Sequence, residues 1–214
     1  MNSKGHQETF ETWNKVAALY DEKFGNLSMY NESYDSFCSL LPLNGSVLDA
    51  GCGPGIISKY LLSRRPDLKI TGIDYAPNMI ELAANNLPQA EFHVLDLREL
   101  SGLNKQFDAI VCGFAIPYLS PDEVGLFFKS AYLLLNRDGL LYLSFVEGKP
   151  EASGFMTGST GDRTWFNYYQ LSFIRKLLFQ EGFQETHFLK IDYPASGGRV
   201  DVHSVLILRK VEMG

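Results

Sequence analysis

Short apolar segments alternate along the chain with segments in which apolar residues recur at helical spacing. The apolar segments are rich in residues that favour β-structure and predict strands at 46–50, 68–73, 90–95, 107–113 and 139–146. The helical spacing predicts helices at 55–64, 77–86 and 121–136. This alternation is typical of an α/β fold, in which helices cover both faces of a doubly wound, mostly parallel sheet.

The pattern changes after the fifth predicted strand. We expect a helix at 167–181, followed by two further strands at 184–193 and 200–210. The connection from Pro194 to Gly198 is short, so these two strands should pair as an antiparallel hairpin. The complete sheet then has seven strands.

Composition and charge exclude several classes of partner. A chain of 214 residues, 45% hydrophobic and 21% charged, is typical of a single globular domain. Its net charge of -6 provides no attraction to a phosphate backbone, so nucleic acid is not an expected partner. No apolar run approaches the ~20 residues that span a bilayer, and the polar start does not resemble a signal peptide. We therefore expect a cytoplasmic protein with no membrane partner.

The three cysteines do not predict a metal site or a disulfide framework. Cys38, Cys52 and Cys112 are odd in number and lack the paired spacing of zinc ligands. We expect reduced cysteines that serve in packing.

A glycine-rich segment predicts a nucleoside site. The segment Val47-Leu48-Asp49-Ala50-Gly51-Cys52-Gly53-Pro54-Gly55 begins with an apolar strand and leads into a helix whose positive end faces the turn. About twenty residues later, Asp74 ends the next strand, where a carboxylate can accept hydrogen bonds from both ribose hydroxyls. The alternative for Asp74 is a cap for the following helix.

The glycine spacing distinguishes between ribose-containing ligands. A nicotinamide or flavin fingerprint has a third glycine where this chain has Ile56. The segment Asp49-Ala50-Gly51-Cys52-Gly53-Pro54-Gly55 instead resembles the first motif of class I S-adenosylmethionine-dependent methyltransferases of the small-molecule type. The resemblance covers residues 41–210 and implies S-adenosyl-L-methionine as cofactor and methyl transfer to a small molecule. It also implies a reversed final strand at the edge of the sheet.

The resemblance also implies roles for individual residues. Asp49 would attract the ammonium group of the cofactor or only cap the turn, Asp74 would bind the ribose, and Asp96 would accept the adenine amino group or remain a solvated turn residue. The expected cofactor-binding residues are Asp49, Gly51, Gly53, Asp74, Tyr75, Met79, Asp96, Leu97, Gly113 and Phe114.

Two flanking segments are expected to form the acceptor site of a single domain, 1–214. Apolar residues at helical spacing in 10–24 predict a helix, and the resemblance implies that 1–40 is a helical lid, although simple packing on the sheet is equally compatible. The second segment, 147–169, is expected to be a glycine-bearing loop insertion. Its aromatic residues favour an apolar or ring-containing acceptor, unless they only anchor the loop.

No catalytic base is evident in the sequence. Many relatives carry a histidine after the fourth strand, where this chain has Pro117-Tyr118, and His93 and His203 are expected to be structural or exposed. Methyl transfer does not require a base, because alignment and exclusion of water can supply much of the acceleration. The candidates near the acceptor are Tyr20, Tyr118 and Trp165.

Two alternative functions remain open from the sequence. One is a nicotinamide-dependent oxidoreductase, which Ile56 and the terminal hairpin disfavour. The other is a non-catalytic S-adenosylmethionine-binding module, which the intact motifs disfavour. The sequence identifies neither the acceptor atom nor the oligomeric state.

Overall fold

The computed structural model describes residues 3–24 and 28–212. The large sheet contains β1 (Ser46–Ala50), β2 (Lys69–Asp74), β3 (Glu91–Val94), β4 (Phe107–Gly113), β5 (Leu135–Glu147), β8 (Phe183–Pro194) and β9 (Val200–Lys210). A second sheet pairs β6 (Gly154–Thr157) with β7 (Arg163–Phe166). The α-helices are α1 (Ser3–Phe24), α2 (Asn31–Leu40), α3 (Ile56–Arg64), α4 (Pro77–Asn86), α5 (Pro121–Leu134) and α6 (Leu171–Gln180). The short 3-10 helices are η1 (Ser28–Tyr30), η2 (Leu97–Gly102), η3 (Ile116–Tyr118), η4 (Pro150–Ala152) and η5 (Ser196–Gly198).

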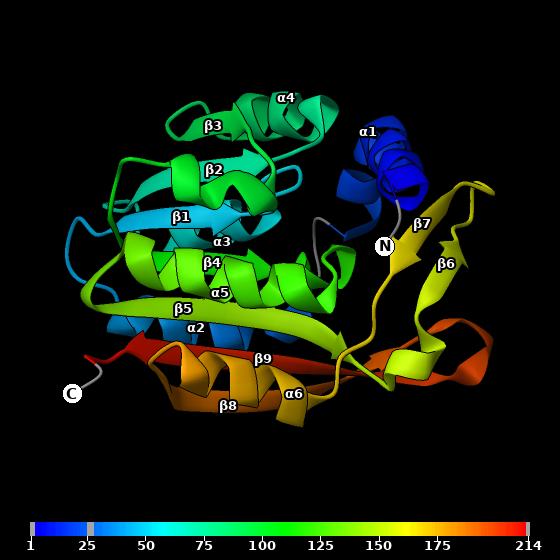
Figure 1. Cartoon of the computed structure of the whole chain (residues 1–214). Helices are drawn as coiled ribbons and strands as arrows, with labels where there is room; N and C mark the ends of the chain where they lie inside the picture. Colours follow the sequence, from blue (N-terminus) through cyan, green and yellow to red (C-terminus); the bar gives the residue numbers. More distant parts are fainter. Residues whose placement is uncertain (1–2, 25–27, 213–214) are drawn as a thin grey trace.

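The large sheet has the strand order β3-β2-β1-β4-β5-β9-β8 (Figure 1). Strands β1 to β5 are parallel, and β9 is antiparallel to both β5 and β8. The expected fold class, seven strands and C-terminal hairpin are confirmed. The expectation that the final strand forms the edge was wrong, because β9 lies between β5 and β8. Residues 205–208 of β9 are at most 2% exposed, whereas most of β8 is solvent-accessible, as suits an edge strand.

Successive residues of the central strands contribute to hydrophobic clusters on opposite faces of the sheet. In β1, Leu48 and Ala50 join the cluster formed with α5 and α6, whereas Val47 joins the cluster formed with α2 and α3. Figure 1 shows α5 and α6 in front of the sheet and α2 and α3 behind it. Because both faces are covered, the carboxyl ends of the parallel strands are the place where a ligand can reach the sheet.

The insertion at 147–169 is a β-hairpin and not the expected loop. Strands β6 and β7 form it, and helix α6 consequently begins at Leu171, later than predicted. The side chain of Asn167 donates to the carbonyl oxygens of Pro117 and Leu119 at 3.0 and 2.8 Å. These bonds hold the segment before α6 against η3.

Helix α1 lies beside β7 at the carboxyl ends of the parallel strands (Figure 1). The hydroxyl of Thr12 donates to the carbonyl oxygen of Arg163 at 2.7 Å, and the backbone N–H of Trp165 donates to the hydroxyl of Thr9 at 2.9 Å. The two segments that flank the predicted methyltransferase core therefore contact each other directly. Within residues 3–24 and 28–212, no helix is both long enough and apolar enough to cross a membrane.

Candidate functional site

The glycine-rich turn follows β1 and adopts a backbone conformation that favours glycine. Gly51, Gly53 and Gly55 have φ values of 78°, 53° and 85°. A Cβ atom at Gly51 would lie 2.6 Å from the Cβ atom of Ala115, whereas one at Gly53 would meet only the ring of Tyr20, at 4.0 Å. The turn is therefore closed against the protein at Gly51 and open towards the cavity at Gly53.

The carboxylate of Asp74 connects this turn to the start of α4. It accepts hydrogen bonds from the backbone N–H groups of Gly53 and Ala76, at 3.0 and 2.9 Å. Burial raises the pKa of Asp74 to about 6, although these two hydrogen bonds oppose the increase. The capping interpretation and the ribose interpretation are compatible here, since each carboxylate oxygen retains a lone pair that a ribose hydroxyl can use.

Asp49 lies behind the turn and does not line the cavity. One of its oxygens accepts from the Ser58 hydroxyl at 2.6 Å, and Oδ1 is buried with no hydrogen-bond partner among the described residues. Burial raises the pKa of Asp49 to about 6. An unpaired, buried acceptor next to a ligand turn is suited to a cationic ligand group, acting through water or by its charge.

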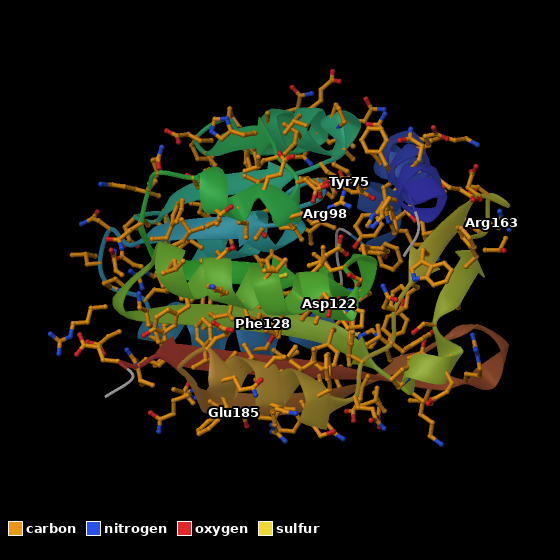
Figure 2. All side chains as sticks on the ribbon, in the orientation of Figure 1. Tyr75, Arg98, Asp122, Phe128, Arg163 and Glu185 are labelled. Carbon is orange, nitrogen blue, oxygen red and sulfur yellow. The ribbon has the colours of Figure 1, made fainter. Side chains whose placement is uncertain are left out.

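Asp96 is bound by a neighbouring arginine that the sequence analysis did not consider. Its Oδ1 accepts from the backbone N–H and Nε of Arg98, at 2.9 and 2.8 Å, and its Oδ2 pairs with Nη2. Burial would raise the pKa of Asp96, but the hydrogen bonds from Arg98 outweigh it and lower that pKa. Nδ1 of His6 in α1 also lies 3.0 Å from Nη1 of Arg98, and Figure 2 shows Arg98 and Tyr75 close to α1. An adenine amino group would thus share Asp96 with a guanidinium.

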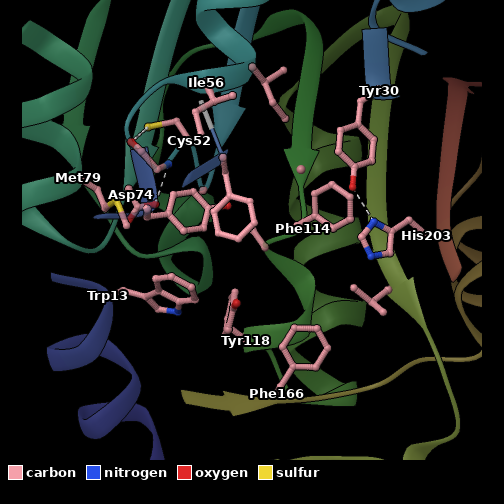
Figure 3. Close-up of a pocket in the computed structure, with 18 of the residues that line it drawn as sticks. Trp13, Tyr30, Cys52, Ile56, Asp74, Met79, Phe114, Tyr118, Phe166 and His203 are labelled. Carbon is pink, nitrogen blue, oxygen red and sulfur yellow. Dashed lines mark hydrogen bonds between the residues drawn. The ribbon is translucent and has the colours of Figure 1, made fainter. Parts of the chain in front are cut away.

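A cavity of about 900 Å³ opens at the carboxyl ends of β1, β2 and β4. Most of the predicted cofactor residues line it, namely Gly51, Gly53, Asp74, Tyr75, Met79, Asp96, Leu97, Gly113 and Phe114. Figure 3 shows Asp74 and Met79 on one side and Tyr30 and His203 on the other, with Phe114 beside the latter pair. We name the part of the cavity near Asp74 and Met79 the nucleoside side, because these residues are the predicted nucleoside contacts, and the part near Tyr30 and His203 the aromatic side.

An aromatic wall connects α1 to the β-hairpin. The ring of Trp13 contacts those of Tyr20 and Tyr118 at centroid distances of 5.3 and 5.5 Å, and Tyr118 contacts Phe166 at 5.9 Å. Tyr20 and Tyr118 line the cavity, as expected for residues near an acceptor.

Trp165 does not line the cavity, which corrects the expectation that it lies near the acceptor. Residues of a strand alternate between faces, so Phe166 faces the cavity and Trp165 lies on the same side of β7 as Arg163, which projects outward (Figure 2). There Trp165 packs on Phe155 and donates from Nε1 to Asn167 at 3.0 Å.

Sequence reasoning missed several residues of the aromatic side. Phe166 and Tyr168 line the cavity, as expected for aromatic residues of 147–169. The missed residues are Tyr30 of η1, Tyr193 of β8 and His203 of β9, the last of which was expected to be structural or exposed. No spacing pattern identified them, because they are far apart in the sequence. The contact between Arg98 and Asp96, in contrast, is local and could have been predicted from the two-residue spacing.

Comparisons with known proteins agree with this geometry. Residues 47–139 match the model of a family described as a methyltransferase domain. A malonyl-[acyl-carrier protein] O-methyltransferase of Acetivibrio thermocellus is 37% identical over 100 residues, which are 46% of this chain and 34% of that protein. The YqeM protein of Bacillus subtilis is 32% identical over 130 residues, 58% of this chain and 51% of that one. The chain thus spans between a third and about half of these relatives.

A solved structure shows the same fold. A crystal structure of an S-adenosylmethionine-dependent methyltransferase from Methanosarcina mazei superposes with a TM-score of 0.71, covers 83% of this chain and 98% of its own, and is 22% identical. None of these matches supports the nicotinamide alternative. Residues 47–139 therefore resemble a methyltransferase domain, and the chain has the fold of the S-adenosylmethionine-dependent methyltransferase from Methanosarcina mazei.

Proposed function

We propose that this protein transfers the methyl group of S-adenosylmethionine to a small, apolar or ring-containing acceptor. The observation that carries the proposal is one continuous cavity, in which the glycine turn and Asp74 lie opposite the aromatic side. A methyltransferase needs such continuity, because donor and acceptor must meet in line.

The residues on the nucleoside side fit the cofactor. Asp74 would bind the ribose hydroxyls, the open backbone at Gly53 would lie against the amino-acid part, and Met79 would pack near the adenine. The buried, unpaired Oδ1 of Asp49 supports a cationic ligand at this turn. Bound there, S-adenosylmethionine supplies an activated methyl group on a sulfonium, and Gly113 and Phe114 would border it.

The chain itself contributes alignment and exclusion of water. Trp13, Tyr20, Tyr118 and Phe166 would form a lid over the acceptor, since they join α1 to the β-hairpin through ring contacts. Closure of such a wall removes competing water and holds the acceptor close to the methyl group. The proposed organisation is one domain, 1–214, with 1–40 and 147–169 as the elements around the acceptor.

The aromatic side of the cavity also supports the proposed acceptor class. Its walls are ring systems, which provide apolar area and edge-to-face contacts for a flat ligand.

The three cysteines are buried free thiols, which supports the proposal that the protein acts in the cytoplasm.

Calorimetry followed by a product screen tests the proposal. The protein should bind S-adenosylmethionine and S-adenosylhomocysteine but not NAD, and Asp74→Ala should reduce both affinities. Incubation of a metabolite extract with methyl-deuterated S-adenosylmethionine should produce a labelled small molecule. Binding of NAD alone would favour an oxidoreductase, and cofactor binding without any labelled product would favour the non-catalytic module.

A further inference from the structure

His203 of β9 forms part of the aromatic side of the cavity. It pairs in the sheet with Val146 of β5 and Ile191 of β8, and it is 6% exposed. The next residue, Ser204, points to the opposite face, where its hydroxyl donates to Glu147. Figure 3 shows the imidazole at the cavity wall, across from Asp74.

Three aromatic residues hold the imidazole in one orientation. Tyr193 stacks on it at a centroid distance of 4.8 Å with the planes 11° apart, and Phe114 contacts it at 5.0 Å. The hydroxyl oxygen of Tyr30 lies 2.7 Å from Nδ1. The other ring nitrogen, Nε2, makes no hydrogen bond to any described residue and remains available to a ligand.

The surroundings of His203 favour the neutral imidazole. Burial lowers its pKa, and Asp201, two residues earlier on β9, only partly opposes this. The other titratable groups around the ring are Tyr30 of η1 and Tyr193 of β8. Burial raises the pKa of Tyr30 well above its ordinary value, so its hydroxyl keeps its proton. At neutral pH, His203 is therefore an uncharged group that can accept a proton.

Tyr30 can bind both protonation states of the ring. A hydroxyl donates to a bare Nδ1 or accepts from Nδ1–H, so it can stabilise the imidazolium that forms when Nε2 gains a proton. This arrangement of an oriented base with one free nitrogen is the geometry that general base catalysis requires.

We infer that His203 is the general base for an acceptor that carries a hydroxyl on a flat ring, with Tyr30 as its positioning residue. The inference rests on the proposed function and names its acceptor class. The acceptor oxygen forms a bond to the methyl carbon as the carbon–sulfur bond breaks, and the carbon–sulfur electron pair stays on sulfur. The hydroxyl proton passes to Nε2, and His203 later releases it to water. Phe114 directly follows β4 and contacts His203, so the base lies beside the position at which Phe114 is proposed to border the methyl group.

Two phenols of different acidity test the inference. The probes are 4-methylphenol, which keeps its proton at neutral pH, and the more acidic 4-nitrophenol, which is largely ionised at mildly alkaline pH and needs no base there. We expect His203→Gln to lower kcat/KM for 4-methylphenol by roughly 10²–10⁴-fold and for 4-nitrophenol much less. The matched control is His187→Gln, at an exposed position of the neighbouring strand, which should leave both values unchanged.

A binding-independent measurement accompanies the kinetics. NMR titration of the protein without ligand should give His203 an apparent pKa below that of a free histidine, and Tyr30→Phe should lower it further. The acidic limb of kcat/KM for 4-methylphenol should follow the same value.

Three results would overturn the inference. Equal losses with both phenols in His203→Gln would reduce His203 to a structural residue. Failure to methylate either phenol, with S-adenosylhomocysteine still bound, would reject the hydroxyl acceptor and leave the proposed function standing. If the unmodified protein does not bind S-adenosylhomocysteine, both the inference about His203 and the proposed function would be rejected.

Discussion

Replacing Gly51 and Gly53 with alanine, one at a time, separates the structural and binding roles of the turn. Both residues have positive φ, so the left-handed backbone conformation of each alanine should cost about 1–2 kcal/mol of folding stability. At Gly51 the new methyl group would also lie 2.6 Å from the Cβ atom of Ala115, and such overpacking costs about 1–3 kcal/mol. At Gly53 the nearest atom is 4.0 Å away, on Tyr20, and no overpacking arises.

The free energy of unfolding should therefore fall by ~2–5 kcal/mol in Gly51→Ala and by ~1–2 kcal/mol in Gly53→Ala. Urea denaturation of the protein without ligand measures both values. The control is Gly125→Ala, within α5, where a Cβ atom meets nothing within 4 Å and φ is not positive. This change should stabilise the protein by about 0.5–1 kcal/mol.

Affinity for S-adenosylhomocysteine should follow a different order from stability. The methyl group of Gly53→Ala enters the cavity, so a folded variant should bind the ligand roughly 5–150-fold more weakly, which corresponds to ~1–3 kcal/mol of crowding. Calorimetry at a temperature where each variant is folded gives this value. Equal stabilities for the two variants, or parental affinity in Gly53→Ala, would show that the turn does not face the ligand as described.

Three further predictions concern the cavity. Asp74→Ala should weaken S-adenosylhomocysteine binding by ~2–4 kcal/mol in calorimetry, because charged hydrogen bonds are lost, and unchanged binding would contradict the ribose role. Because burial raises the pKa of Asp49 and of Asp74 to about 6, the unliganded fold binds protons more tightly than the unfolded chain, and their destabilising effect should decrease as the pH falls below 6. The cationic cofactor favours both carboxylates ionised, so its affinity should fall by up to about tenfold per pH unit below that point for each carboxylate, with proton release visible as buffer-dependent heats. Phe166→Ala should lower turnover of the acceptor and leave cofactor affinity within roughly tenfold, whereas Trp165→Ala should affect turnover much less, and the opposite ranking would reverse the assignment of faces on β7.

The sequence predicted the parts of the site that depend on neighbouring residues. The turn after β1 could be identified because Gly51 and Gly53 adopt φ values that other residues avoid, a property of each residue alone. Asp74 could be identified because it ends the strand next to β1, so its position follows from the sheet order. The boundaries of the parallel strands were similarly accessible, since their apolar segments are continuous.

The sequence was insufficient where a side chain's role depends on an unknown pairing. The exposed and buried faces of β7 exchange if its register shifts by one residue, so Trp165 and Phe166 could not be distinguished before the hairpin was known. The position of β9 between β5 and β8 likewise depends on long-range pairing. The burial of its residues shows that β9 is a central strand, but the short connection to β8 gave no order within the sheet, and the final strand was expected at the edge.

The aromatic side of the cavity was decided by tertiary structure alone. Tyr30 and His203 are separated by 173 positions and meet at 2.7 Å because η1 and β9 pack at the same end of the sheet. Backbone conformation and hydrophobic periodicity are local and can be read from one sequence. Contacts between distant segments depend on how all the elements pack together, and the acceptor site is made of such contacts.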